Sequence, residues 1–207
     1  MEKRKNNIYL RKNILTLKLN QMSKAKLLNS ERVYTGKISI RKDEFIIQNK
    51  KIQKEIVEHS PSVGLIPIVD CSNILLITQY RHAAKKTLLE IPAGKIEDGE
   101  TKEEAAKREL QEETGYTGTL SFLTKWYLAP SYDTELMYIF IVTNLKKISN
   151  KLGDDDDENI KLKKLGIKTV LKKCINGEII DCKTVAALFA YQEYIRLHKS
   201  NINKKIV

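Results

Sequence analysis

The sequence contains few cysteines and no long apolar run. These absences argue against a protein held together by disulfides and against a membrane-spanning protein. Its three cysteines lack the paired spacing of a metal site, and their odd number argues against a disulfide framework. No stretch approaches the roughly 18 consecutive apolar residues of a membrane-spanning helix. The basic start is not followed by the apolar segment of a signal peptide. We therefore expect a reducing, cytoplasmic location and no membrane partner.

Positive charge is in excess, with 37 lysines and arginines against 26 acidic residues and a net charge of +11. Residues 1–21 hold six of the basic residues and a single acidic one, so much of the excess lies at the start of the chain. The remainder shows no basic stripe interleaved with aromatic residues, which single-strand nucleic-acid binders use. A modest positive field is sufficient to attract a phosphate-bearing small molecule. We therefore expect no nucleic-acid partner.

At 207 residues, 42% of them apolar, the chain is long enough for one ordinary domain and a small additional element. A basic extension is expected over residues 1–29, and an N-terminal β-sheet element over residues 30–58. The main domain is expected over residues 59–198, and a basic tail over residues 199–207. Within the N-terminal element, the patterns of residues 33–40, 43–48 and 52–58 predict three short strands. A sheet this small is not stable alone.

The main domain contains one segment with strong helix signals. Thr101 and Glu104 have the spacing of a capping box, in which each side chain satisfies a backbone amide of the first turn. Gly115 suits a left-handed C-terminal cap. The sequence therefore predicts a helix between these signals, with an apolar stripe formed by Ala105, Ala106 and Leu110.

Three glutamates, Glu109, Glu112 and Glu113, project toward one side of this predicted helix. Like charges at spacings of three and four residues cost a helix a few tenths of a kcal/mol per pair. A hard divalent cation removes that repulsion, because carboxylate oxygens are the ligands that Mg2+ and Mn2+ prefer. A solvated acidic face is the alternative. The nearby glycines, Arg108 and Glu100 favour the metal site.

Gly94-Lys-Ile-Glu-Asp-Gly-Glu100 and Arg108-Glu-Leu-Gln-Glu-Glu-Thr-Gly-Tyr116 together fit the pattern G-x5-E-x7-R-E-U-x-E-E-x-G-U, where U is a bulky apolar residue. This pattern is the Nudix box, and the chain resembles the Nudix hydrolases, which are metal-dependent pyrophosphohydrolases. The resemblance implies metal ligation by Glu109 and Glu113, sometimes with Glu112, and by the backbone carbonyl of Ala93. It implies supporting roles for Arg108 and Glu100, and Mg2+ as the cofactor, with Mn2+ as the alternative.

The implied fold belongs to the α/β (α+β) class. It is the Nudix α/β/α sandwich with a mixed sheet, preceded here by the small N-terminal antiparallel β-sheet. Apolar runs after residue 59 agree with this order of elements. They predict strands over residues 63–69, 74–79, 122–128, 136–143 and 160–165, and helices over 167–174 and 184–198.

From about Val33 to about His198 the sequence resembles the ADP-ribose pyrophosphatases of this superfamily. Four features carry the resemblance: Gln79-Tyr-Arg81 followed by Leu89-Glu-Ile-Pro-Ala-Gly94, Pro130 at 15 residues after Gly115, Ser131-Tyr-Asp-Thr-Glu135, and Gly177-Glu-Ile-Ile-Asp-Cys-Lys-Thr184. The implied reaction is hydrolysis of ADP-ribose to AMP and ribose 5-phosphate. Another nucleoside diphosphate sugar, such as ADP-glucose or GDP-mannose, is the first alternative. A non-catalytic binder that senses ADP-ribose is the second, although such binders typically lose box carboxylates.

The resemblance also implies residues that bind the nucleoside diphosphate sugar. Arg81 would clamp a phosphate, because a guanidinium matches phosphate bidentately. Glu135 would accept hydrogen bonds from a ribose, and Lys95 would contact the substrate. Lys54 stands where relatives often have an arginine that crosses a dimer interface, and a lysine offers a point charge instead of a fork. The implied assembly is a homodimer formed through residues 33–58.

The general base is expected in the acidic run that ends at Glu158. In the subgroup a carboxylate from a loop after the central strands accepts the proton of the attacking water, which is general base catalysis. Glu158 is the first candidate and Asp156 the second, and Glu112 is a further acid at the catalytic centre. The choice between Glu158 and Asp156 stays open, because the family usually has glutamates here and an aspartate is one methylene shorter.

Overall fold

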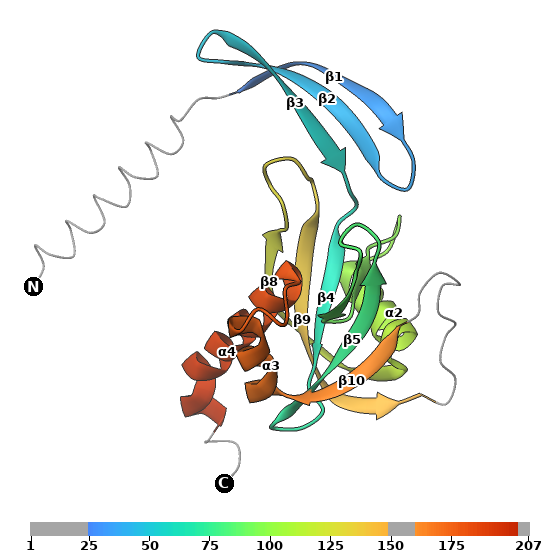
Figure 1. The fold of residues 1–207 in the computed structure, drawn as a ribbon, viewed down its shortest axis with the longest axis vertical. Coiled ribbons are helices and arrows are strands. Elements are labelled where there is room, and N and C mark those ends of the chain that lie inside the picture. The colour runs from blue at the N-terminus through green and yellow to red at the C-terminus, as the bar shows by residue number, and fades with distance from the viewer. Residues whose placement is uncertain (1–24, 149–159, 203–207) are drawn as a thin grey trace, which may run out of the picture. The chain divides into compact units, whose positions relative to one another are not determined.

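The computed structural model describes residues 25–148 and 160–202. The chain divides into two compact units, one ending at His59 and the other beginning at Ser60 (Figure 1). The basic extension over residues 1–21 and the acidic candidates Asp156 and Glu158 lie outside the described residues, so what was predicted for them stays a prediction. Within the described residues, no helix combines the length and the apolar character needed to cross a bilayer.

The first unit contains an antiparallel sheet in the order β1-β2-β3. Its strands are β1 (Lys26–Thr35), β2 (Ser39–Ile47) and β3 (Lys50–Glu58). The predicted strand over residues 33–40 is wrong, because the chain turns at residues 36–38 and pairs Thr35 with Ser39. The turn expected near residue 42 is instead the middle of β2. There Asp43 is buried and accepts hydrogen bonds from Ser30 Oγ at 2.6 Å and Arg41 Nε at 3.0 Å.

In the described part of the second unit there are two further sheets and three helices. The four-stranded sheet has the order β7-β4-β9-β8 and the three-stranded sheet the order β10-β5-β6. The strands are β4 (Ser62–Pro67), β5 (Asn73–Arg81), β6 (Lys86–Glu90), β7 (Ala93–Lys95), β8 (Tyr116–Tyr127), β9 (Leu136–Lys147) and β10 (Lys161–Gly166). The helices are α2 (Lys102–Thr114), α3 (Ile167–Ile175) and α4 (Cys182–Ile202).

Successive side chains of the parallel strands β4 and β9 point to opposite faces of the sheet, and helices cover both faces. Val63 and Leu65 of β4, with Phe140 of β9, pack against α2. Their neighbours Ile66 and Ile139 belong to the other core, which contains residues of α3 and α4. Successive residues of a strand point to opposite faces, so two fully buried faces need an apolar residue at nearly every position. The α/β/α sandwich with a mixed sheet is confirmed, and Figure 1 shows α2 across the sheets from α3 and α4.

Helix α2 begins and ends at the residues that the sequence indicates. Thr101 and Glu104 form the predicted capping box, with Glu104 N donating to Thr101 Oγ1 at 3.2 Å and Thr101 N donating to Glu104 Oε2 at 2.8 Å. Gly115 ends the helix in the left-handed region, with φ of 72°, where a residue without Cβ has no steric penalty. The caps fix which residues face the sheet, and these include Glu109 and Glu113 as well as the apolar stripe.

Candidate active site

The site lies where α2 packs against β7 and the loop that joins β7 to α2. Arg108 is the centre of the hydrogen-bond network in this site. The guanidinium donates to Glu100 at 2.9 and 3.0 Å, to Glu109 Oε1 at 2.7 Å, to Glu112 Oε2 at 3.0 Å and to the Lys95 carbonyl at 2.8 Å. The hydrogen bonds that Arg108 donates to Glu100 are the largest cause that raises the pKa of Arg108, and partial burial opposes it. The same contact lowers the pKa of Glu100. One cation therefore holds three carboxylates in place.

Glu109 reaches over the backbone of Gly94. The glutamate is only 8% exposed. A Cβ built on Gly94 would lie 1.9 Å from Glu109 Oε1, a separation that real atoms do not show. The absence of a side chain at Gly94 is thus what allows the carboxylate to occupy this position. This is a use of glycine for close approach and does not involve a positive φ.

Glu113 is fixed by the neighbouring peptide. Its Oε2 accepts a hydrogen bond from Ala93 N at 2.8 Å, and the residue is 6% exposed. Because Ala93 begins β7, this bond joins α2 to the strand that carries Gly94. Glu109 and Glu113, one helical turn apart, therefore meet two adjacent residues of β7, Gly94 and Ala93.

The donor set suits a hard divalent cation. Two nearly buried carboxylates and the Ala93 carbonyl supply only oxygen atoms, which Mg2+ and Mn2+ prefer. Among the described residues, no three histidine, cysteine or acidic side chains form a ready ligand cluster. Mg2+ commonly binds one or two carboxylates and completes its shell with water and substrate phosphate, so a complete protein cage is not required. Nudix hydrolases as a family use divalent cations of this kind.

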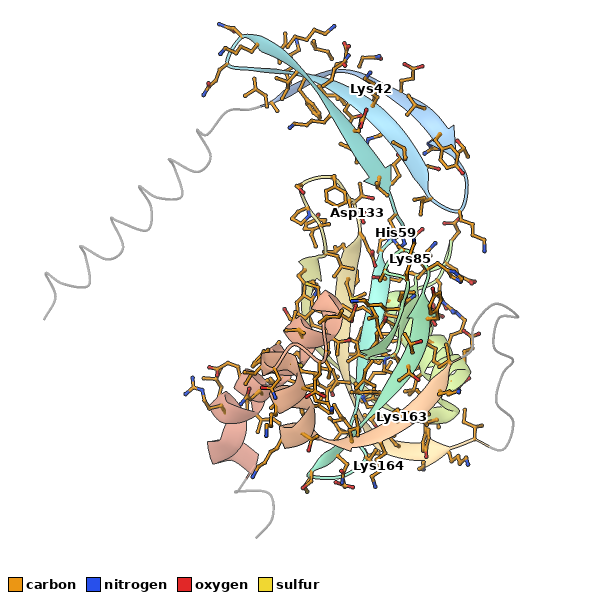
Figure 2. The ribbon with its side chains drawn as sticks, viewed as in Figure 1. Lys42, His59, Lys85, Asp133, Lys163 and Lys164 are labelled. Carbon is orange, nitrogen blue, oxygen red and sulfur yellow. The ribbon has the colours of Figure 1, made fainter. Side chains whose placement is uncertain are left out.

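Arg81, at the end of β5, is also bound by a carboxylate. Its Nε and Nη2 donate to Glu90 Oε1 and Oε2 at 2.9 and 2.7 Å. Glu90 is fully buried, and Lys183 Nζ donates to the same Oε2. The hydrogen bonds that Arg81 donates to Glu90 are the main cause that raises the pKa of Arg81, and the charge of Glu113 adds to it. Arg81 thus lies within electrostatic reach of Glu113. Lys85, labelled in Figure 2, belongs to the short turn between β5 and β6.

The other predicted binding residues have different surroundings. Glu135, which precedes β9, accepts a hydrogen bond from Ser62 Oγ at 2.6 Å. Its backbone N–H donates to Asp133, which is labelled in Figure 2, at 2.9 Å. Lys95 lies on β7, and its carbonyl is the one that Arg108 binds. Lys54 is exposed on β3 of the first unit, opposite Asp43 in the strand register.

The sequence prediction did not assign roles to Glu90 and Lys183. The sequence does indicate that Glu90 has a partner. It is the one charged residue in the apolar run from Leu88 to Ile91, and a buried charge needs a partner. Lys183 lies in the stretch 177–184 that supports the subgroup resemblance. Their pairing joins residues 93 positions apart, and nothing local in the sequence indicates it.

Comparison with known proteins shows which family the chain resembles. The NUDIX domain family model matches residues 58–174, more than half of the chain. An ADP-ribose pyrophosphatase of Bacillus subtilis (strain 168) is 33% identical, over 84% of this chain and 94% of its own length. A methanol dehydrogenase activator of Bacillus methanolicus is 31% identical, over 88% of this chain and 98% of its own. A crystal structure of an ADP compounds hydrolase aligns with a TM-score of 0.74 and 27% identity, over 84% and 95% of the two chains.

These similarities extend beyond the box over most of the chain, and they include the fold. The chain belongs to the Nudix family, and it is a Nudix hydrolase.

Proposed function

We propose that this Nudix hydrolase cleaves the pyrophosphate of ADP-ribose to AMP and ribose 5-phosphate, with Mg2+ as its cofactor. The observation that carries the proposal is the placement of Glu109 and Glu113 against the backbone of β7, with Glu113 within the electrostatic reach of Arg81. That arrangement puts oxygen ligands for a cation next to a guanidinium that suits a phosphate. The bound cation would neutralise phosphate oxygens and lower the pKa of a water.

The remaining roles belong to side chains of this chain. Glu109 and Glu113, with the Ala93 carbonyl, would hold the cation, and Glu112 would join them when released from Arg108. Glu158, or Asp156 in its place, would accept the proton of the attacking water, as general base catalysis requires. Mn2+ is the alternative cation, because its preference for oxygen ligands is similar.

Arg81, Glu135 and Lys95 are our candidates for binding the substrate. The guanidinium would bind one phosphate, and the Glu135 carboxylate, oriented by Ser62, would accept hydrogen bonds from a ribose hydroxyl. The relatives named ADP-ribose pyrophosphatase and ADP compounds hydrolase support an ADP-containing substrate. Other nucleoside diphosphate sugars contain the same diphosphate and stay as alternatives.

A substrate panel tests the proposal. Wild-type protein with Mg2+ is incubated with ADP-ribose, ADP-glucose and GDP-mannose, and release of AMP or GMP is measured. We expect kcat/KM to be highest for ADP-ribose. A higher value for either nucleotide hexose would assign the other substrate class, and binding of ADP-ribose without turnover would identify a non-catalytic sensor.

We further propose that the first unit forms a homodimer, to which Lys54 contributes a substrate contact. Strand β1 is exposed along its whole length, and it includes the apolar side chains of Leu27 and Val33. An isolated three-stranded sheet without a buried face is not stable in water. A second copy of the sheet would cover this surface.

Sedimentation measures this assembly directly. The wild type is expected at about 48 kDa, twice the chain mass of 23.8 kDa. Val33→Asp would shift it toward the monomer, because a charge in an apolar interface has no partner. Ile175→Asp, at a 74% exposed apolar residue of α3, is the matched control and should leave the mass unchanged. A monomeric wild type would contradict the proposal.

A further inference from the structure

The Glu90 carboxylate lies in the interior between two cations. It is 0% exposed, accepts two hydrogen bonds from Arg81, and shares Oε2 with Lys183 Nζ. Burial raises the pKa of Glu90, but the hydrogen bonds from Arg81 and the charge of Lys183 outweigh it, so the pKa lies below its ordinary value. A buried carboxylate with one cation would offset that cation completely. Lys183 is the second cation, and its own partner Asp181 is the second carboxylate, so the four side chains together are balanced in charge.

Lys183 is held from the other side by the start of α4. Asp181 Oδ1 accepts a hydrogen bond from Lys183 Nζ at 3.0 Å. Asp181 Oδ2 accepts from Thr184 N at 3.0 Å and from Thr184 Oγ1 at 2.5 Å, which is the geometry of a helix N-cap. The lysine therefore has little freedom to move away from Glu90, and its own side chain is only 10% exposed.

The segment from Glu90 to Ala93 connects this network to the box. Ile91 N donates to Thr184 Oγ1 at 2.8 Å, and Ala93 N donates to Glu113 at 2.8 Å. Three of these four residues thus contact helices: Glu90 and Ile91 contact α4, and Ala93 contacts α2. If the Lys183 side chain moved, Glu90 and then Arg81 would move with it, whereas α2 would stay in place.

Arg81 differs from Lys183 in accessibility. Its side chain is 37% exposed, against 0% for Glu90. It uses two of the five N–H donors of a guanidinium on Glu90, and the others point away from that carboxylate. Among the three linked side chains, Arg81 is thus the one that an outside anion can reach.

We propose that Lys183 is a positioning residue for substrate binding: it offsets the charge of Glu90, so that the positive charge of Arg81 stays available to the diphosphate. The inference rests on the proposed function, since Arg81 acts there as the phosphate clamp. Without Lys183, Glu90 would be balanced by Arg81 alone, and the attraction of Arg81 for an anion would fall. Lys183 itself does not touch the substrate.

A double-mutant cycle tests this coupling. The affinity for ADP-ribose is measured by titration calorimetry in EDTA, so that neither metal binding nor turnover contributes. Lys183→Met is expected to weaken binding about tenfold, or about 1.4 kcal/mol, in the otherwise wild-type protein. In the Arg81→Ala background the same substitution should change the affinity less than about twofold, because coupled residues are not additive. An equal loss in both backgrounds, or no loss in either, would overturn the inference.

Companion variants separate positioning from folding. Lys183→Arg should restore affinity to within about twofold, since it supplies a cation at the same place. Lys173→Met is the matched control, because Lys173 pairs with Glu178 at an exposed position, and it should leave affinity unchanged. If Lys183→Met does not fold, Lys183→Gln carries the cycle. If none of the three Lys183 variants folds, the residue serves stability and the inference is overturned.

A second titrant separates this inference from the proposed function. The cycle is repeated with magnesium-free inorganic pyrophosphate as the probe. Coupling with pyrophosphate, but no binding of ADP-ribose by the wild type, would support the positioning role and contradict the proposed substrate. Binding of ADP-ribose without coupling would do the reverse. Binding of neither probe would contradict both.

Discussion

Glu113→Gln is expected to lower kcat for ADP-ribose hydrolysis by at least about 100-fold, which corresponds to about 2.7 kcal/mol of transition-state stabilisation. The substitution removes a negative charge from a group that would bind the cation, and a neutral amide is a much weaker ligand for Mg2+. Shape and volume change little. The amide oxygen can still accept the hydrogen bond from Ala93 N, which is 2.8 Å from the carboxylate in the native protein.

We therefore expect Glu113→Gln to lose activity because it binds the metal less well, and not because it folds less well. The unfolding temperature should stay close to that of the wild type, whereas the concentration of Mg2+ needed for half-maximal activity should rise. The matched control is Glu103→Gln, the same chemical change on the exposed face of α2, where Glu103 pairs only with Lys102 among the ion pairs of the described residues. It should leave kcat within about twofold. Equal rates for Glu113→Gln and the wild type would count heavily against the assignment of the site.

The parts of the site that local sequence determines were predictable. The capping residues Thr101 and Glu104 and the terminal Gly115 are signals within one helix, and each acts on its nearest turn. Once the helix is bounded, its 3.6-residue period decides that Glu109 and Glu113 share a side. The motif therefore predicted the relative placement of the carboxylates before any tertiary contact was known.

The contacts of Arg81 were not predictable in the same way. The sequence indicated a phosphate clamp at this position, but the two hydrogen bonds to Glu90 depend on the pairing of β5 with β6. The contact of Glu90 with Lys183 depends further on how α4 packs. Such contacts follow from tertiary packing, and a pattern of residue types does not determine them.

The N-terminal hairpin shows a second reason for error. Residues 33–40 contain enough β-branched and aromatic side chains to indicate one continuous strand, yet the chain turns at residues 36–38. Strand propensity reflects burial and cross-strand partners more than backbone preference, so it does not locate a turn. The hydrogen bond from Ser30 of β1 to the buried Asp43 of β2 joins two residues that are paired in the register of these strands. That register was not visible from composition.

Gly94→Ala is expected to lower kcat by about 100-fold while the protein keeps its fold. A Cβ at this position would lie within 2.3 Å of all three atoms of the Glu109 carboxyl group. Those atoms are the far end of a flexible side chain, so the carboxylate can rotate away at little cost to stability. Once rotated, the Glu109 carboxylate no longer lies beside β7. A displacement of about 1 Å at a reacting centre costs on the order of 100-fold in rate.

Stability and activity should therefore separate in this variant. Gly94 does not have a positive φ, so alanine causes no backbone strain, and the unfolding temperature should change by only a few degrees. Gly166→Ala is the matched control, since a Cβ there meets its nearest atom at 3.6 Å, and both kcat and stability should stay near wild type. A Gly94→Ala protein with full activity would show that the carboxylate of Glu109 need not lie over β7. Metal binding would then have to depend on Glu113 and the remaining acids, because Glu109 would be free to leave its position without effect.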